Sequence, residues 1–252
     1  WSPDGRAIAF STRRGEDEVN QIYVLNMEGP GEAVRITDIA TGAATPRWSP
    51  DGSRIAFESK VYPGAADNEA NAAEKKAREE RKVNVSAYEM FPVRQWDRWR
   101  DDLQTRLFVQ DARAGAEARD LLAGSRLVAG PGYGGVPSLA GESLAARWTP
   151  DGRGLVFSAT TNLDEAARAP TFYHLFHVDA GGGTPTQLTS GDAFSCHSAK
   201  FAVDGRALFC LFVPVSESAY NQTELARFDW PRSGLPADFS PEAVLLTDDL
   251  DR

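Results

Sequence analysis

The decapeptide WSPDGRAIAF at residues 1–10 decides the fold, because close variants recur along the chain: WSPDGSRIAF at 48–57, WTPDGRGLVF at 148–157 and FAVDGRALFC at 201–210. The Ser-Pro-Asp-Gly core places proline, with its preset φ, at the second turn position and glycine, which tolerates positive φ, at the fourth. Apolar β-forming residues follow each turn. Each copy therefore predicts a β-hairpin, with Trp1, Trp48 and Trp148 at the ends of the strands that enter it.

Further extended runs follow the hairpins, as in QIYVLNMEG (21–29) with AVRITD (33–38), and FYHLFHVDA (172–180) with PTQLTS (185–190). Their alternation of apolar and polar positions is the strand period, so each unit is a meander of about four strands. The copies start 47, 100 and 53 residues apart, and two of these intervals lie near the roughly 40–50 residues of a propeller blade. A β-sandwich with similar hairpins is the alternative. We predict an all-β fold, a partial β-propeller of about four blade units near 1–47, 48–147, 148–200 and 201–252.

The second unit is longer because residues 61–102 interrupt it, and its next strand resumes at RLFVQDARAG (106–115). Residues 67–83 are rich in Ala, Glu, Lys and Arg and contain no glycine or proline, a composition with strong helix propensity. We therefore expect a helical insertion in one blade.

Composition excludes several classes of protein. Hydrophobic residues make up 42% and charged residues 25% of the 252 positions, which is ordinary for a globular chain. A net charge of −9 argues against nucleic acid as a partner, since phosphate binding needs a concentrated basic face. No run approaches the roughly 18 apolar residues of a membrane span. No zinc-type Cys/His spacing is present, and His174 and His177 lie three apart, on opposite faces of a strand. We expect neither a metal nor a cofactor.

The repeat resembles that of TolB-like proteins and of the prolyl oligopeptidase family, in which W-S-P-D-G-x-x-I-A-F marks the hairpin of each blade. The insertion is similar to that of dipeptidyl-peptidase 5 and acylaminoacyl-peptidase-like members of the latter family. There, a V-Y-P segment, a charged helix and a P-V-R-x-W-D-x-W segment follow one another. The matching residues here are Val61, Tyr62, Pro63, Pro92, Val93, Arg94, Trp96, Asp97 and Trp99.

This resemblance implies a seven- or eight-bladed propeller that caps a C-terminal α/β-hydrolase domain carrying Ser, Asp and His. The chain contains no Gly-x-Ser-x-Gly nucleophile motif, and its first unit begins at the hairpin. We therefore expect a noncatalytic, substrate-gating propeller portion of a serine peptidase that hydrolyses short peptides, of dipeptidyl- or acylaminoacyl-peptidase type. Its partners would be the hydrolase domain of the same polypeptide and short peptides, and an oligomer is compatible with the sequence. The alternative is a TolB-like platform for protein binding without enzyme activity, which has no need of the insertion.

Candidate substrate-binding residues lie mainly in the insertion: Arg94, Trp96, Asp97 and Trp99. A guanidinium can bind a carboxylate, a carboxylate can hold an amine, and indoles offer rigid walls. In the alternative, Arg94 and Asp97 pair structurally while the tryptophans pack the insertion onto its blade.

Three further residues are weaker candidates for peptide binding. Glu79 and Glu80 resemble the paired glutamates with which some dipeptidyl-peptidases of this superfamily hold a free N-terminus, but a solvated helix face with i,i+4 pairs is the preferred interpretation. Tyr133 lies in the glycine-rich loop 130–138. This loop lacks the context of a phosphate site and is expected to be a mobile connection between blades whose Tyr133 lines a pocket.

The stretch SGDAFSCHS contains Asp192, Ser195 and His197, but these are near neighbours on one strand and do not form a triad. The chain is therefore expected to hold no catalytic residues. If the last hairpin turns about residues 203–204, Cys196 and Cys210 are cross-strand neighbours within the uncertainty of the register. A disulfide would suit an exported protein and paired thiols the cytosol. Relatives that carry a similar insertion are often exported, so the resemblance slightly favours the periplasm or secretion.

Overall fold

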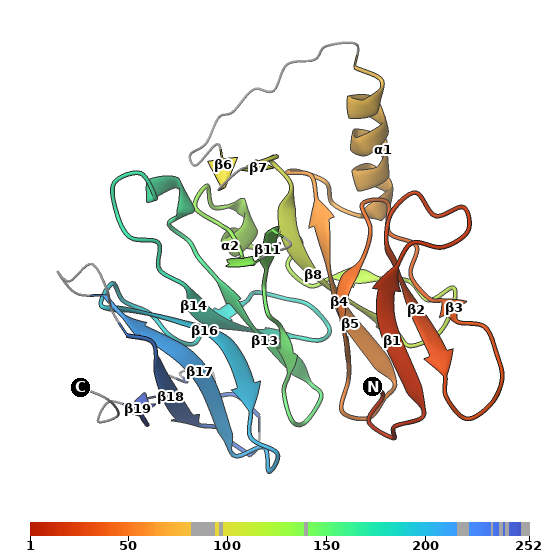
Figure 1. Ribbon diagram of the computed structural model, residues 1–252. Coiled ribbons are helices and arrows are strands. Elements are labelled where there is room, and N and C mark those ends of the chain that lie inside the picture. Colours follow the sequence, from red (N-terminus) through yellow and green to blue (C-terminus); the bar gives the residue numbers. More distant parts are fainter. Residues whose placement is uncertain are drawn as a thin grey trace. The chain divides into compact units, whose positions relative to one another are not determined.

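The computed structural model describes residues 1–81, 94–95, 98–138, 141–215, 222–232, 234–236, 239 and 242–247. The chain divides into two compact units, Trp1–Ala129 and Gly130–Arg252. Both are built from small antiparallel sheets (Figure 1). The all-β prediction with a helical insertion is confirmed. No helix in the described part of the chain is long and apolar enough to cross a membrane.

The described part of the first unit contains two larger sheets, each connected as a meander, and one small hairpin. One is β1–β2–β3, formed by Ala7–Thr12, Gln21–Asn26 and Val34–Arg35. The second is β4–β5–β8–β9, formed by Ala44–Trp48, Arg54–Val61, Gln104–Asp111 and Arg119–Asp120. A small hairpin pairs β6 (Arg94–Gln95) with β7 (Arg98–Trp99). Two helices complete the unit, α1 (Asn68–Glu79) and α2 (Arg126–Ala129).

The second unit repeats the four-stranded meander twice. One sheet is β12–β13–β14–β15, formed by Arg147–Trp148, Gly154–Ala159, His174–Asp179 and Thr186–Gln187. The other is β16–β17–β18–β19, formed by Phe194–Phe201, Ala207–Pro214, Glu224–Asp229 and Val244–Leu245. A hairpin of β10 (Val136–Ser138) and β11 (Gly141–Ser143) and the short 3₁₀ helix Leu163–Glu165 complete it.

The repeated turn joins the first and second strands of each four-stranded sheet, and in the first copy it directly precedes β1. The blade repeats expected from the sequence were counted from the first residue of each repeated decapeptide. Each sheet begins earlier than that, because its first strand lies mostly before the decapeptide: β4 starts at Ala44 and β16 at Phe194. The turns explain why the same residues recur. Ser49 Oγ donates to Asp51 Oδ1 (2.5 Å) and accepts from Arg54 N (2.9 Å), while Ser53 N donates to the same carboxylate (3.0 Å). Gly52 completes the turn at φ 73°, in the left-handed region.

The carboxylate is essential to this turn because it accepts several hydrogen bonds at once. The hydrogen bond from the Ser49 hydroxyl is the main cause that lowers the pKa of Asp51 to about 2. Thr149 and Asp151 repeat the hydroxyl–carboxylate bond at 2.6 Å. In the fourth copy Ala202 supplies no hydroxyl, and only Arg206 N still donates to Asp204 Oδ1 (3.0 Å).

We expect Ser49→Ala to lower the free energy of unfolding by about 1 kcal/mol, because it removes two hydrogen bonds of a fully buried hydroxyl. The stabilisation that the ionised Asp51 gives is complete above its unfolded pKa of roughly 4 and is lost as the pH falls towards 2. The variant should lose part of this acid dependence. Urea unfolding at several pH values measures both effects. Ala202→Ser, the reverse change in the fourth turn, is the control and should not destabilise; equal losses in both variants would contradict the assignment.

Each unit has its own apolar core. In the first, Phe57 and Phe108 stack with ring centroids 5.5 Å apart, among buried residues that include Ile22 and Ile55. In the second, Val156 and Leu175 of one sheet pack with Leu208 and Phe228 of the next. Full burial of side chains of this size contributes roughly 1.5–3 kcal/mol each, so the packing of sheet on sheet within each unit stabilises the fold.

A β-bulge recurs in the entering strands. Thr45, Ala145 and Ser198 have left-handed backbone conformations, with φ of 51°, 49° and 60°, and each lies three residues before the aromatic residue of the repeat. The register shifts at this point in both β4 and β16. Because the bulge recurs at one position, it is a constant part of the blade.

Candidate functional site

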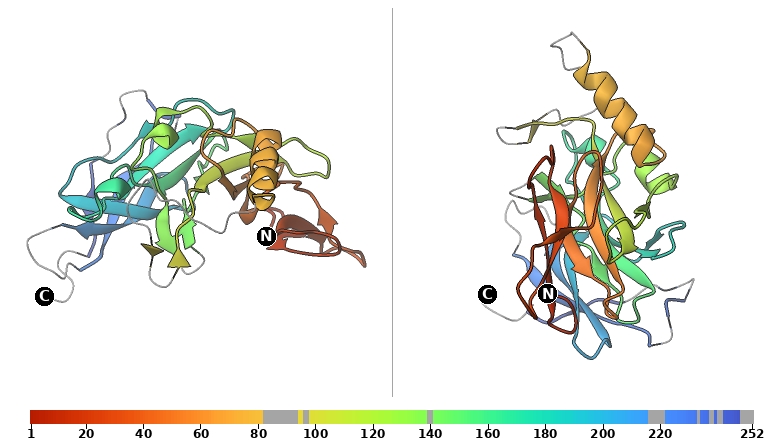
Figure 2. Two further views of the ribbon diagram at one scale, coloured as in Figure 1. Left: turned by 90° about the horizontal axis from the view of Figure 1, so that it is seen from above. Right: turned by 90° about the vertical axis from the view of Figure 1, so that its right-hand side faces the viewer.

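The insertion leaves and rejoins one sheet at a single point. β5 and β8 pair along their whole length, with Val61 opposite Gln104. Residues 62–103 therefore form an excursion between two adjacent strands. Helix α1 lies at one end of the strands of its own unit (Figures 1 and 2). It begins after Asp67, whose side chain accepts from Ala70 N at 2.8 Å, and it ends at Glu79, short of the expected 83.

Polar side chains attach α1 to its sheet. Asn71 is 2% exposed; its Nδ2 donates to Thr41 Oγ1 (3.0 Å) and Lys60 O (3.2 Å), and its Oδ1 accepts from Tyr62 N (2.9 Å). Asn68 Oδ1 accepts from Ala40 N at 3.0 Å. A buried amide that satisfies several backbone groups at once fixes the position of the helix more strictly than apolar contact would.

Arg78 holds the other end of the helix. Its two Nη atoms donate to the two carboxylate oxygens of Asp102, both at 2.7 Å, and its Nε donates to Glu74 Oε1 at 2.6 Å. The guanidinium also lies 4.4 Å from the ring centroid of Tyr62. The hydrogen bonds with Asp102 raise the pKa of Arg78 above its ordinary value. Arg78 thus joins the helix to both ends of the insertion, since Tyr62 follows β5 and Asp102 precedes β8.

The hairpin β6–β7 presents two of the candidate residues together. Arg94 lies opposite Trp99 in the register. Arg94 is exposed, and Trp99 is 68% exposed, which is unusual for an indole. Trp96 and Asp97 lie outside the described residues, so the pairing of Arg94 with Asp97 stays a prediction. The hairpin therefore offers a cation beside a flat apolar surface.

Glu79 and Glu80 lie on the exposed part of the helix end. Lys75 Nζ is 3.8 Å from Glu79 Oε1, an i,i+4 pair. Glu80 is the C-cap, and its backbone N–H donates to the carbonyls of Arg78 and Lys76. Exposure and an i,i+4 pair are the features of a solvated helix face, the interpretation preferred from the sequence.

Tyr133 is buried, at 5% exposure. Its loop is held by backbone hydrogen bonds: Gly134 pairs with Thr160 in an antiparallel bridge, and Leu163 N donates to Gly132 O at 2.9 Å. The expected mobile connection is thus a tightly packed segment, and the Tyr133 side chain lies within it.

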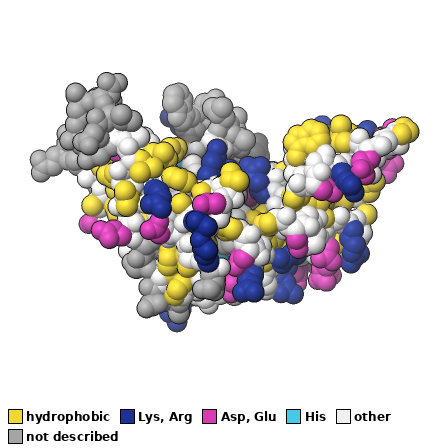
Figure 3. Space-filling model, turned by 90° about the horizontal axis from the view of Figure 1, so that it is seen from below, with side chains coloured by type: hydrophobic (Ala, Val, Ile, Leu, Met, Phe, Trp, Pro, Cys, Tyr) yellow, Lys and Arg dark blue, Asp and Glu magenta, His cyan; other side chains and the backbone are white. Residues whose placement is uncertain are grey.

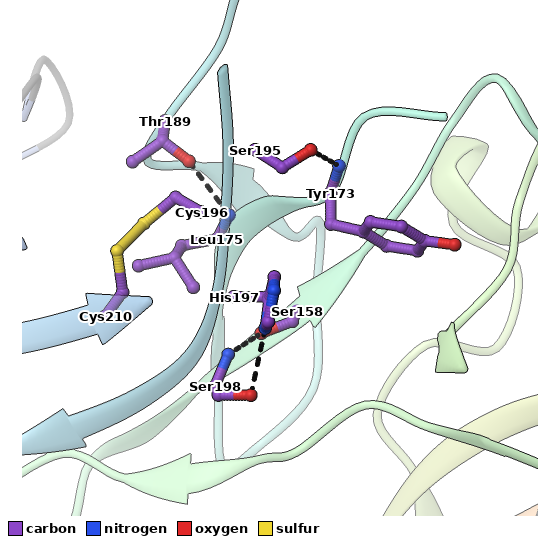
Figure 4. Close-up of a disulfide and its surroundings, with 9 residues drawn as sticks. All are labelled: Ser158, Tyr173, Leu175, Thr189, Ser195, Cys196, His197, Ser198 and Cys210. Atoms are coloured by element: carbon purple, nitrogen blue, oxygen red, sulfur yellow. Dashed lines mark hydrogen bonds between the residues drawn. A yellow bond between two sulfur atoms is a disulfide. The ribbon is translucent and has the colours of Figure 1, made fainter. Parts of the chain in front are cut away.

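The polar residues around Cys196 are occupied in structural contacts (Figure 4). Ser195 Oγ accepts from Tyr173 N at 3.1 Å, and His197 Nδ1 lies 3.0 Å from Ser198 Oγ. Burial lowers the pKa of His197 and of His174. Among the residues that the structure describes, no three His, Cys, Asp or Glu side chains gather as a metal site would require.

Cys196 and Cys210 form a disulfide with a Cα–Cα distance of 6.0 Å. Cys196 lies opposite Phe212 in the register, so the disulfide joins diagonal positions. The offset arises at the turn, which is centred between residues 204 and 205 because Phe201 lies opposite Leu208; the bulge between His197 and Lys200 then reduces the offset by one residue. Both cysteines are buried, at 0% and 1% exposure.

Sequence reasoning missed the contacts of Arg78 with Asp102 and Tyr62. The only signal was the position of an arginine within a charged helix, where exposed ion pairs are the ordinary expectation. On the face drawn in Figure 3, basic and acidic side chains of the described residues are interspersed.

Comparisons with known proteins support the propeller fold. No protein-family model matches the chain. The chain is 29% identical over 174 residues to the "uncharacterized peptidase YuxL" of Bacillus subtilis, covering 69% of this chain and 23% of that protein. It superposes on the acylaminoacyl peptidase of Pyrococcus horikoshii with a TM-score of 0.60 at 15% identity, over 100% of this chain and 32% of that one.

A puromycin-hydrolyzing peptidase of Mycobacterium tuberculosis gives a TM-score of 0.50 at 16% identity, over 90% of this chain and 27% of that one. The chain thus spans 23% to 32% of the length of these proteins. The resemblance to the propellers of prolyl oligopeptidase family peptidases is confirmed at the level of the fold.

Proposed function

We propose that the chain is the noncatalytic, substrate-gating propeller portion of a serine peptidase that hydrolyses short peptides, of dipeptidyl- or acylaminoacyl-peptidase type. One observation carries the proposal. An insertion between adjacent strands of one blade is attached through the buried Asn71 and through the ion pair of Arg78 with Asp102, and its hairpin exposes Arg94 beside Trp99. A propeller that served only as a binding platform would have no need of such an element.

In this proposal the propeller selects which peptides reach the active site, and a separate domain hydrolyses them. A C-terminal α/β-hydrolase domain of the intact polypeptide would supply the serine, histidine and aspartate, and hydrolysis would pass through a covalent acyl intermediate on that serine. The propeller would admit short peptides and exclude folded proteins. Arg94 would bind a peptide carboxylate or carbonyl, and Trp99 would offer a wall for an apolar side chain.

The Cys196–Cys210 disulfide supports a further part of the proposal. Disulfides persist in oxidising compartments and are rare in the cytosol. We therefore propose an exported protein, periplasmic or secreted.

We expect Arg94→Ala in the intact polypeptide to lower kcat/KM for short peptides by about 10-fold, the loss of one charge-assisted hydrogen bond, through KM with kcat nearly unchanged. Trp99→Ala should act in the same direction. Steady-state kinetics with peptides of two to ten residues measures the effect. Arg6→Ala is the matched control, because Arg6 is an exposed arginine outside the insertion.

Two results would contradict the proposal. Equal kinetics for Arg94→Ala, Trp99→Ala and the control would remove the insertion from substrate binding. Absence of both peptide hydrolysis and labelling by a fluorophosphonate serine probe would leave a TolB-like binding platform instead.

A further inference from the structure

The insertion has two limbs that start from neighbouring strands. The outgoing limb leaves β5 at Tyr62, and the return limb enters β8 through Asp102. Arg78 of α1 contacts both limbs. Its two Nη atoms donate to the two carboxylate oxygens of Asp102, both at 2.7 Å, and its guanidinium lies 4.4 Å from the ring centroid of Tyr62. Arg78 therefore closes the base of the insertion.

The guanidinium of Arg78 is itself held in place. Its Nε donates to Glu74 Oε1 at 2.6 Å, one helical turn earlier. The buried Asn71 attaches the same helix to Lys60 O of β5 at 3.2 Å. All three guanidinium nitrogens thus donate to carboxylates, on a helix that is fixed to its sheet. A planar guanidinium that binds a carboxylate bidentately sets both the distance and the direction of its partner.

The return limb carries the candidate residues of the hairpin. Trp99 is three residues before Asp102, so the Cα atoms of these two residues are at most about 11 Å apart. From Trp99 to Leu103 no residue is buried, so apolar packing does not fix this part of the chain. The positions of Trp99, and of Arg94 opposite it, therefore depend on the contact that joins Asp102 to the helix.

We propose that Arg78 is a positioning residue of the candidate peptide site: its two hydrogen bonds with Asp102 hold the hairpin β6–β7 so that Arg94 and Trp99 contact a peptide together. The inference rests on the proposed function, because it concerns the same site. Arg78 acts through the return limb and does not touch the peptide. Its loss therefore weakens peptide binding and leaves the chemical step in the hydrolase domain unchanged.

We expect Arg78→Ala in the intact polypeptide to raise KM for short peptides by about 5-fold, the upper end of the range for a partly exposed ion pair, with kcat nearly unchanged. Lys75→Ala is the matched control and should keep the KM of the wild type. Lys75 lies on the same helix and pairs with Glu18 and Glu79 instead of the return limb.

Two further variants test whether Arg78 acts through the hairpin. In a polypeptide that already carries Arg94→Ala and Trp99→Ala, the added Arg78→Ala should leave KM unchanged, because the residues that it positions are absent. Arg78→Cys with Asp102→Cys should raise KM as Arg78→Ala does, and a short bismaleimide that joins the two new thiols should lower KM again. Cys196 and Cys210 do not react, since they are joined to each other.

Three results would overturn the inference while the proposed function stands: a wild-type KM for Arg78→Ala, an undiminished effect of Arg78→Ala in the absence of Arg94 and Trp99, or a KM that the bismaleimide bridge leaves raised. A fall in kcat as large as the rise in KM would also overturn it, because Arg78 would then affect more than the hairpin. A wild type that hydrolyses no peptide refutes the proposed function and this role with it, so the two failures are distinguishable.

Discussion

Gly132→Ala should lower the free energy of unfolding by about 3 kcal/mol, the upper part of the range for overpacking. A Cβ at Gly132 would lie 2.2 Å from Thr161 O and 2.4 Å from Asp164 Oδ1. The first of these atoms belongs to the backbone, so it cannot move aside as a flexible side chain would. To admit a methyl group the loop must lift, which breaks the hydrogen bond from Leu163 N to Gly132 O and exposes Tyr133.

The matched control is Gly181→Ala, where a Cβ would meet nothing within 4 Å and the backbone is not left-handed. This variant should leave the free energy of unfolding unchanged or raise it slightly. Urea unfolding gives the free energy of unfolding of both variants. Equal stability of the two variants would mean that the loop yields freely, as a mobile connection would.

This loop shows where sequence reasoning about glycine succeeds and where it fails. In the repeated turn, glycine is needed because the backbone has a positive φ, and the Pro-Asp-Gly motif predicts this from the sequence. In the loop at 130–135, glycine is needed because another segment approaches closely, and its partners Thr161 and Asp164 lie about thirty residues away. A pattern within the loop cannot reveal a contact of that kind, so the loop was expected to be mobile.

The sheets and the insertion were predictable because local patterns determine them. Alternating apolar positions indicated the strands, and the long interval between the second and third copies of the decapeptide indicated an insertion in the second blade repeat. The prediction of the helix end was less accurate: the composition allowed a helix to residue 83, whereas the helix ends at Glu79 and Glu80 is its C-cap. Charged residues have good helix propensity on either side of that point, so propensity alone could not place the end.

The candidate site was predictable only in part. Resemblance pointed to Arg94 and Trp99, and the structure pairs them across a hairpin. Nothing in the sequence separated Arg78 from the other arginines near it. Its role depends on Tyr62 and Asp102, sixteen residues before it and twenty-four after it, and these meet only because β5 and β8 are adjacent.

Removal of the disulfide by Cys196→Ala with Cys210→Ala should lower the free energy of unfolding by about 3 kcal/mol. The two cysteines close a loop with a sequence separation of 14, and a cross-link of that span restricts the unfolded chain by roughly this amount. Urea unfolding of the oxidised wild type and of the double variant measures this difference in the free energy of unfolding. The reduced wild type separates the cross-link from the small change in packing, since it keeps both sulfur atoms.

Burial decides how the disulfide responds to reductant. With 0% and 1% of the cysteines exposed, a thiol can attack only after the sheet opens locally, so reduction should be slow in the native chain and fast in urea. The disulfide is then a structural one. Identical urea midpoints for the oxidised and reduced wild type would show that it contributes nothing. Alkylation of both cysteines when cells are denatured in the presence of an alkylating agent, before any reductant is added, would show that they are thiols in the cell and would argue against export.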